Sequence, residues 1–173
     1  GTGRAVAIAF AREGANVAIQ YFPGEEKDAC QVKELIEKEG RKALLLPVDL
    51  RDKDVATEIV EKTVEEFGQL DLLVLNAAQQ IAHEKLEELP IEQVEDSFKV
   101  NVISMFETVK AAEKYLQPGS AIITTTSVVS FHPSPALMDY AATKASVTNL
   151  TLTLAEYFAP KGIRVNGVAP GPI

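Results

Sequence analysis

Short apolar runs alternate with longer segments of helical periodicity along this chain. The apolar runs lie at 15–19, 43–48, 70–75, 121–126 and 163–169. Because such runs carry apolar side chains on both faces, they indicate strands buried on both faces, as in parallel sheets. The segments with helical periodicity lie at 4–12, 25–39, 52–67, 91–116 and 138–159. This alternation predicts an α/β fold with a Rossmann-like, doubly wound parallel sheet and right-handed crossovers.

The boundaries of two predicted helices are marked by glycine. The segments 25–39 and 52–67 are followed by Gly40 and Gly68, and glycine is the usual residue just past a helix C-terminus. We expect Cys30, inside the first of them, to be a small buried or half-buried side chain rather than a nucleophile. No repeat, low-complexity tract or linker interrupts the pattern, so residues 1–173 predict a single domain.

Composition excludes several classes of protein. The apolar and charged fractions, 46% and 24%, are ordinary for a soluble protein. The net charge of −8 argues against nucleic acid as a partner, and no apolar run is long enough to span a membrane. One cysteine cannot form an internal disulfide, which fits a cytoplasmic protein. His83 and His132 lack partners at metal-ligand spacing, so we expect no metal site.

The chain opens with two glycines at the start of a predicted helix. Gly1 and Gly3 precede the helical segment 4–12. Glycines let a backbone approach a pyrophosphate, and a helix N-terminus offers free N–H groups and a positive dipole end. The alternative is a flexible terminus without a binding role.

Polar and small residues follow two of the predicted strands. Asp49 and Leu50 come after the run 43–48, and Asn76 and Ala77 come after 70–75. Ligands of open α/β sheets bind outside the carboxyl ends of the strands, so these residues stand where a dinucleotide could lie. For Asp49, capping a helix N-terminus is an equal alternative.

The strongest local pattern is the pair Tyr140 and Lys144. Their spacing of four residues places both side chains on one face of a helix. An ammonium nearby favours tyrosinate, so it should lower the tyrosine pKa and make Tyr140 a competent general acid/base. Tyr157 and Lys161 have the same spacing, but Pro160 lies between them at a helix end, where the shared face is lost.

A serine stands upstream of Tyr140 at a suitable distance. Ser127 lies 13 residues earlier, just past the predicted strand 121–126, where its hydroxyl could bond a substrate carbonyl oxygen. Ser130 is a competing candidate three residues further from the strand end. The alternative for Ser127 is a hydroxyl that caps backbone.

Together, in their order, these residues resemble the short-chain dehydrogenase/reductase family over the whole chain. Gly1 to Gly3 resembles the last part of that family's glycine-rich segment, and Asn76-Ala77-Ala78 resembles its N-A-G motif with Ala78 in place of glycine. Asn101, Ser127, Tyr140 and Lys144 match the family's catalytic tetrad. The segment 164–173 matches the stretch after its sixth strand. Pro133-Ser134-Pro135 is similar to the glucose/ribitol dehydrogenase-like branch.

The resemblance implies a role for each matching residue. Tyr140 exchanges the proton with the substrate oxygen, Lys144 holds the nicotinamide ribose, and Ser127 orients the carbonyl or alcohol. Asn101 holds a water that links Lys144 to solvent. The implied cofactor contacts are Gly1 and Gly3 at the pyrophosphate, Asp49 and Leu50 at the adenine, Asn76 and Ala77 at the adenosine side, and Pro170, Gly171 and Ile173 at the nicotinamide.

The resemblance therefore implies an enzyme that interconverts a secondary alcohol and a ketone or aldehyde with NAD or NADP. The choice between the two cofactors stays open, because Gln20-Tyr21 stands where an acid favouring NAD is expected. A 3-oxoacyl-thioester reductase and a non-catalytic fragment of such an enzyme remain alternatives.

Against the family pattern, the chain lacks the first strand and the C-terminal substrate-binding region. We therefore expect an incomplete dinucleotide-binding and catalytic domain. The expected partners are a small alcohol or carbonyl substrate and further copies of the chain, in a dimer or tetramer built on the helices near 91–116 and 138–159.

Overall fold

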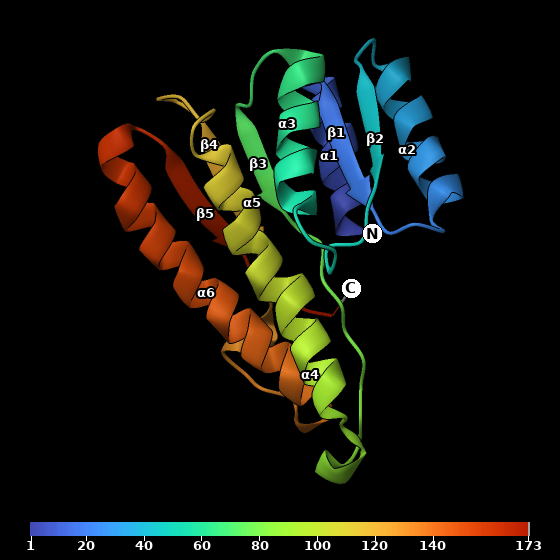
Figure 1. The fold of residues 1–173 in the computed structure, drawn as a ribbon, viewed down its shortest axis with the longest axis vertical. Helices are drawn as coiled ribbons and strands as arrows, with labels where there is room; N and C mark the ends of the chain where they lie inside the picture. The colour runs from blue at the N-terminus through green and yellow to red at the C-terminus, as the bar shows by residue number, and fades with distance from the viewer. Residues whose placement is uncertain (173) are drawn as a thin grey trace. The chain divides into compact units, whose positions relative to one another are not determined.

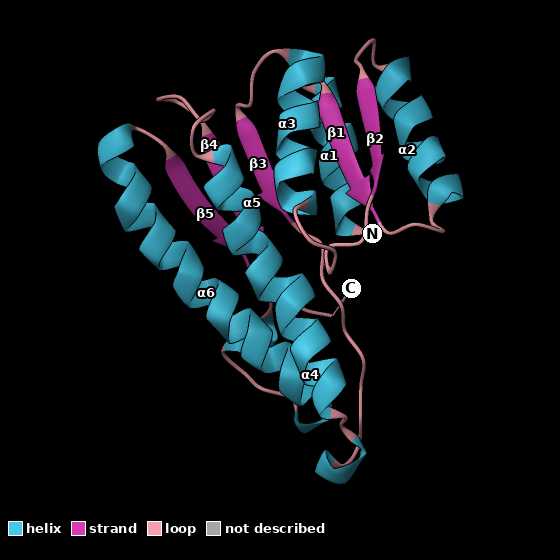
Figure 2. Cartoon of the chain, in the orientation of Figure 1, coloured by secondary structure: helices cyan, strands magenta, loops and turns pink. Residues whose placement is uncertain are grey.

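The computed structural model of the chain describes residues 1–172. It divides into two compact units, Gly1–Gln69 and Leu70–Ile173. Each unit contains helices and a parallel sheet (Figures 1 and 2). Each is described by itself below.

The first unit pairs two parallel strands with three helices. In chain order its elements are α1 (Thr2–Arg12), β1 (Val17–Tyr21), α2 (Glu26–Lys38), β2 (Ala43–Pro47) and α3 (Val55–Phe67). The strands are in register from Val17 opposite Ala43 to Tyr21 opposite Pro47. Their apolar side chains pack with those of α1 and α2 in a small core formed by Ala7, Ala11, Val32 and Ile36, with Ile8, Val17, Ile19 and Ala43 against it.

Helix α2 shows how the periodicity places its side chains. Ala29, Val32 and Ile36 are buried, because a spacing of three or four residues keeps them on one face. The expectation for Cys30 was wrong: its side chain is exposed. One residue further along a helix is a rotation of about 100°, which turns Cys30 away from the face that Ala29 shares with Val32 and Ile36.

Helix α3 ends as predicted at Gly68. This residue has a φ of 79°, in the left-handed region where glycine carries no steric penalty. Its N–H donates to the Val64 carbonyl at 2.7 Å, which satisfies one of the last free carbonyls of the helix.

The second unit holds a three-stranded parallel sheet and the longest helix. Its main elements are β3 (Leu72–Leu75), α4 (Ile91–Phe98), α5 (Ser104–Ala112), β4 (Ala121–Thr125), α6 (Met138–Phe158) and β5 (Arg164–Val168). The strand order is β3-β4-β5. The sequence-based prediction of an α/β fold with parallel strands is confirmed, with each strand within two residues of its predicted ends.

Helix α6 is tied to β4 by a row of hydroxyl groups. Thr124 and Thr151 share a buried hydrogen bond of 2.7 Å. Thr126 lies 2.5 Å from the Thr148 hydroxyl and donates to the Lys144 carbonyl at 3.2 Å. These bonds fix the rotation of α6 against the strand, and therefore which of its residues face the carboxyl end of the sheet.

Strand β5 approaches the same row closely at Gly167. A Cβ atom at this position would lie 3.2 Å from the Thr124 hydroxyl oxygen and 3.3 Å from the Thr151 methyl carbon. Glycine is therefore needed here for β5 to pack beside β4 and α6 without displacing them.

The helix predicted over 91–116 is interrupted. Between α4 and α5 the backbone forms a π-helical segment, Lys99–Ile103. Such segments insert one extra residue into a helical turn and are frequent at functional sites. Within residues 1–172, no helix is long and apolar enough to cross a membrane.

Candidate active site

The pair Tyr140 and Lys144 lies in the first two turns of α6. The Lys144 ammonium nitrogen is 5.5 Å from the centre of the Tyr140 ring, so the two side chains share one face of the helix, as their spacing predicts. Lys144 is only 1% exposed, while Tyr140 is half-buried. The ammonium is therefore shielded from water, while part of the Tyr140 side chain is accessible.

Lys144 is held from the end of the neighbouring strand. Its Nζ atom donates to the carbonyl of Thr125, the last residue of β4, at 2.6 Å. Burial lowers the pKa of the Lys144 ammonium to about 8, because a charged group loses hydration there. At neutral pH this lysine is still mostly protonated, and it is easier to deprotonate than a surface lysine.

Ser127 lies just past β4, where the sequence predicts it. It is buried and occupies the N-cap of a short 3₁₀ turn, where its Oγ atom accepts from the Val129 N–H at 3.4 Å. Ser127 therefore does cap the backbone, as the alternative interpretation predicted, although the hydrogen bond is long. Since that bond uses the oxygen as an acceptor, the hydroxyl hydrogen can still be donated to a substrate oxygen.

The competing serine has a different partner. The Ser130 hydroxyl lies 2.8 Å from that of Thr126, within the row of hydroxyls that ties α6 to β4. This leaves Ser127 as the better candidate of the two for contacting a substrate.

Asn101 lies inside the π-helical segment and is fully buried. Its side-chain oxygen accepts from the Gln79 N–H at 2.7 Å, and its amide nitrogen donates to the Gln79 carbonyl at 2.9 Å. The same nitrogen donates to the Thr143 hydroxyl at 3.0 Å. The Asn101 side chain thus joins the segment after β3 to α6, and the water-holding role that the resemblance implies stays a prediction.

Two residues of this arrangement were not found from the sequence. The Thr143 hydroxyl donates to the Tyr140 carbonyl at 2.7 Å while accepting from Asn101, so it connects the helix turn of Tyr140 to the π-helical segment. The position of this threonine, three residues after Tyr140 in a predicted helix, could have indicated the bond. Thr125 contributes its backbone carbonyl, and because every residue has one, the sequence does not indicate this role.

Other predicted residues lie at the ends of the strands in the same unit. The Asn76 side-chain oxygen, after β3, accepts from the Thr125 hydroxyl at 3.0 Å, and the half-buried Ala77 follows it. After β5, the Pro170 carbonyl accepts from the Val128 N–H at 3.0 Å. Gly171 lies beside the Val128 side chain, and Ile173 lies outside the described residues.

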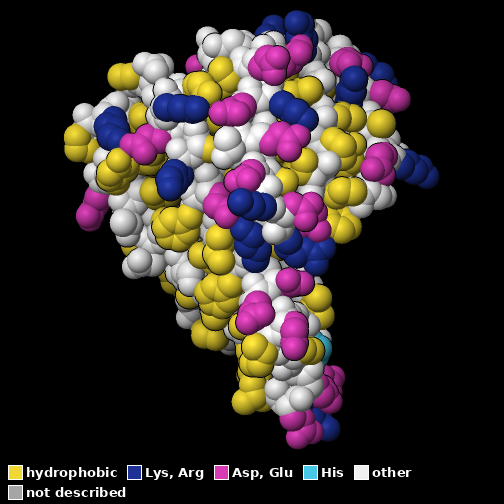
Figure 3. Space-filling model, viewed as in Figure 1, with side chains coloured by type: hydrophobic (Ala, Val, Ile, Leu, Met, Phe, Trp, Pro, Cys, Tyr) yellow, Lys and Arg dark blue, Asp and Glu magenta, His cyan; other side chains and the backbone are white. Residues whose placement is uncertain are grey.

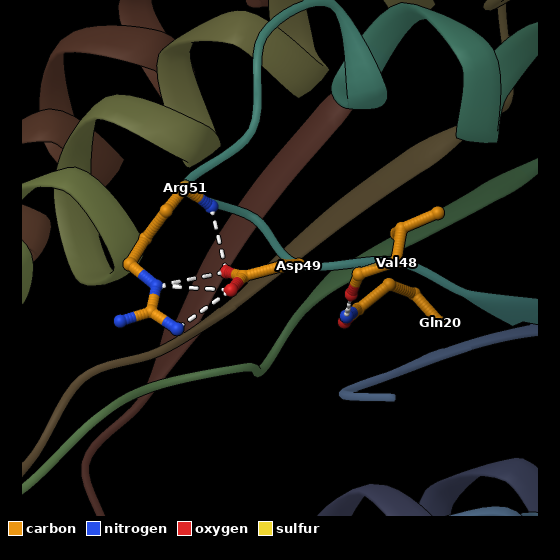
Figure 4. A network of polar contacts seen from close by, with 4 residues as sticks. All are labelled: Gln20, Val48, Asp49 and Arg51. Atoms are coloured by element: carbon orange, nitrogen blue, oxygen red, sulfur yellow. Dashed lines mark hydrogen bonds and ion pairs between the residues drawn. The ribbon is translucent and has the colours of Figure 1, made fainter. Parts of the chain in front are cut away.

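The first unit carries the remaining predicted cofactor residues. Asp49 follows β2 and forms a two-pronged ion pair with Arg51, with contacts of 2.6 to 3.0 Å, and it also accepts from the Arg51 N–H at 2.9 Å (Figure 4). The Arg51 hydrogen bonds hold the pKa of the Asp49 carboxyl below its usual value. Since α3 begins at Val55, Asp49 caps the turn before that helix rather than the helix itself.

The position at which an acid would favour NAD over NADP is visible in the same view. Gln20, near the end of β1, donates to the Val48 carbonyl at 2.9 Å (Figure 4). The Gln20 side chain is neutral, and its amide nitrogen is already hydrogen-bonded within the first unit. Leu50 follows Asp49 and is half-buried.

The glycines at the start of the chain form a helix N-terminus. Helix α1 begins at Thr2 with Gly1 as its N-cap, and Gly3 lies in the first turn. The first N–H groups of an α-helix have no partner within the helix. This end is therefore a chemically suitable place for a phosphate, although a helix N-terminus alone does not define a site.

The two histidines differ in exposure. His132 is exposed, and His83 is half-buried with its ring near Gln93. Among residues 1–172, no group of three His, Cys, Asp or Glu side chains could hold a metal ion.

The parallel α/β architecture, with polar residues at the strand ends, defines a Rossmann-like protein. Residues 1–173 match the family model described as enoyl-(acyl carrier protein) reductase. The chain belongs to the short-chain dehydrogenase/reductase family, as its motifs predict.

Individual relatives agree with this assignment. An uncharacterized oxidoreductase, YhxD of Bacillus subtilis, is 56% identical over the whole chain and 58% of its own length. Two Arabidopsis thaliana proteins also match the whole chain: NADPH-dependent aldehyde reductase 1, 42% identical over 62% of its length, and glucose and ribitol dehydrogenase homolog 2, 41% identical over 61%. The latter agrees with the branch suggested by 133–135.

A solved structure gives the same picture. A short-chain dehydrogenase from Burkholderia cenocepacia in complex with NADP is 35% identical, with a TM-score of 0.90 over 97% of this chain and 69% of that one. The chain spans about 60% of the length of the curated relatives it matches.

Proposed function

We propose that this protein is an NAD(P)-dependent oxidoreductase that interconverts a secondary alcohol and a ketone or aldehyde, with Tyr140 as general acid/base. The observation that carries the proposal is the placement of Tyr140 over the buried ammonium of Lys144, which is hydrogen-bonded to the end of β4, the strand that Ser127 follows. A general acid needs a positioned proton and a nearby group that stabilises the conjugate base, and this arrangement supplies both.

In the reduction direction the chain's own residues handle the proton. Ser127 donates a hydrogen bond to the carbonyl oxygen and orients it toward Tyr140. The Tyr140 O–H bond breaks as its proton passes to the developing alkoxide, which becomes the alcohol. Lys144 stabilises the tyrosinate that remains until it regains a proton from solvent. The nicotinamide, when bound, supplies the hydride to the carbonyl carbon.

The donor set at Lys144 fits the ribose of such a cofactor. An ammonium carries three N–H groups, and the Thr125 carbonyl accepts one of them. The other two suit the paired hydroxyls of a ribose. The remaining contacts are proposed at Asn76, Ala77, Pro170 and Gly171 in the second unit, and at Gly1, Gly3, Asp49 and Leu50 in the first.

Both NAD and NADP stay within the proposal. Gln20 provides neither a carboxylate for the ribose 2′-hydroxyl nor a cation for a 2′-phosphate. The relatives named above include an NADPH-dependent aldehyde reductase and a structure with NADP. These names support trying NADPH first in any assay.

The names of the relatives also suggest which substrates to test. Aldehydes and polyols correspond to the aldehyde reductase and to the glucose and ribitol dehydrogenase homolog. An acyl-thioester substrate is the second candidate, because the matching family model is described as an enoyl-(acyl carrier protein) reductase. A panel of aldehydes, sugar alcohols, 3-oxoacyl and enoyl thioesters separates the two.

The decisive experiment is Tyr140→Phe in the full-length protein. Removal of the phenol oxygen takes away the proton donor, so we expect turnover to fall by at least about 100-fold, in the range contributed by general acid catalysis. Cofactor binding and the unfolding midpoint should change little, because the ring is kept. Near-normal turnover in this variant would show that the proposed role of Tyr140 is wrong.

A further inference from the structure

A buried carboxylate stands directly before the proposed acid/base. Asp139 is only 4% exposed, although it belongs to the first turn of α6. Its Oδ2 atom accepts from the Ser97 hydroxyl at 2.6 Å and from the Gln93 side-chain amide at 3.2 Å. Both partners come from α4. The first turn of α6 is thus joined to α4 through one carboxylate oxygen.

The charge state of Asp139 follows from these bonds. Burial alone would raise the pKa of its carboxyl and is the largest single influence. Hydrogen bonds from Ser97, from Gln93 and from the N–H groups of Tyr140 and Asp139 itself outweigh it, so the pKa lies below its usual value. Asp139 is therefore an anion at neutral pH, and it stays an acceptor.

The network extends from Asp139 to the segment after β3. The Gln93 side-chain oxygen lies 2.6 Å from His83 Nε2, and the Gln93 amide also donates to the Ile81 carbonyl at 3.4 Å. The backbone N–H of His83 donates to the carbonyl of Ala136, just before α6, at 3.0 Å. One glutamine thus connects α4, residues 81–83 and the start of α6.

We propose that Asp139 is a positioning residue for Tyr140, acting through Ser97 and Gln93 to fix the first turn of α6 against α4 and residues 81–83. This inference rests on the proposed function, because it assigns a task to the helix turn that carries the acid/base. It adds a second anchor near Tyr140: Asp139 precedes Tyr140 in the chain, and Thr143, which is bonded to Asn101 and to the Tyr140 carbonyl, follows it.

The free N–H groups of a first helical turn favour an acid at this place, but they do not explain why it is buried against α4. Burying an anion costs free energy, and apolar residues of similar volume often stabilise a protein as well or better. Compared with apolar packing, hydrogen bonds also define the orientation of the groups they join, because each bond fixes a donor and an acceptor in one geometry. A defined direction matters most where a proton must be delivered, because a misplacement of about 1 Å can cost roughly 100-fold in rate.

The test compares Asp139→Ala with Asp139→Asn in the full-length enzyme. Alanine removes both anchors, so we expect kcat to fall by about 10- to 100-fold. Asparagine can keep its oxygen at the Oδ2 position and accept both bonds, but its NH₂ then takes the position of Oδ1, which is buried without a hydrogen-bond partner. It should therefore recover part of the loss, with a kcat clearly above that of Asp139→Ala. In both variants the KM for the cofactor should stay unchanged.

Ser97→Ala removes one of the two bonds to Asp139, and Gln93→Met removes the other together with the bonds of Gln93 to Ile81 and His83. Both variants serve if Asp139→Ala does not fold. Ser97→Ala should lower kcat by about threefold to tenfold, as expected for the loss of one hydrogen bond worth about 1 kcal/mol, and Gln93→Met by at least as much, with the cofactor KM unchanged in both. Glu156→Ala, an exposed acid on the same helix, is the matched control and should behave as wild type.

The two proposals fail in different ways. If Tyr140→Phe is fully active, the proposed function is wrong, whatever the Asp139 variants do. If Tyr140→Phe is inactive while the folded Asp139→Ala, or Ser97→Ala with Gln93→Met, keeps wild-type kcat, the positioning role is wrong. A kcat of Asp139→Asn that is no higher than that of Asp139→Ala also overturns it, because the effect would then follow the charge instead of the two bonds.

Discussion

Lys144 shows how much burial changes the chemistry of a single residue in this protein. The spacing to Tyr140 predicts that the two side chains share a face, and they do. The spacing says nothing about how deeply the ammonium is buried. Its pKa of about 8 comes from desolvation by the packing of α6 on the strand ends, which is a property of the tertiary structure.

The stability of the protein should depend on pH through this lysine. Its pKa is about 8 in the folded state, below the value of about 10.4 expected when unfolded. Between these values the unfolded chain binds more protons, so the free energy of unfolding should rise as pH increases from about 8 to about 10. Lys144→Met should remove this rise. Urea unfolding of both proteins across that range measures it, and equal pH slopes would contradict the prediction.

At the scale of elements, the break between α4 and α5 and the attachment of α6 to β4 position the site. Periodicity predicts a single helix over 91–116, and no proline or glycine in that stretch marks a break. The π-helical segment between them is stabilised by the bonds of Asn101 to Gln79 and Thr143. Those partners are 22 and 42 residues away in the chain, beyond the reach of a local pattern.

The attachment of α6 to β4 should depend on the paired hydroxyls of Thr124 and Thr151. Thr151→Val leaves the buried Thr124 hydroxyl without its partner, so we expect a loss of about 1 to 3 kcal/mol in the free energy of unfolding. The double variant Thr124→Val/Thr151→Val removes both groups and should cost less than the sum of the single changes. Denaturant unfolding of the four proteins gives the coupling; strict additivity would show that the bond is not responsible.

For the whole molecule, the exposed apolar side chains of the second unit bear on assembly. Figure 3 shows hydrophobic side chains gathered over α4, α5 and α6. Exposed apolar residues of these helices and of the π-helical segment between α4 and α5 include Ile91, Ile103, Phe106 and Leu152. Exposed apolar patches of this kind often mark protein–protein contacts. We propose that these helices join copies of the chain in a dimer or tetramer, as the family resemblance implies.

Phe106, which is 54% exposed on α5, is the sharpest probe of this assembly. Phe106→Glu places a charge in a contact that would have to bury it, so we expect the full-length protein to shift to a smaller species. Cys30→Glu introduces the same charge at an exposed position of α2, outside these helices, and should leave the mass unchanged. Light scattering coupled to size exclusion measures the mass directly, and a monomeric wild type would rule the prediction out.

The sequence by itself determined the elements and most of the candidate site. Strands and helices follow from local periodicity, and Ser127, Tyr140 and Lys144 follow from spacing together with their place after strands. The tertiary structure decided what depends on residues distant in the chain. It turned Cys30 outward, inserted the π-helical segment at Asn101, buried Lys144 and surrounded Asp139 with hydrogen-bond donors. The physical reason is that side-chain direction along one element is set by backbone geometry, whereas burial and hydrogen-bond partners are set by whichever elements pack against it.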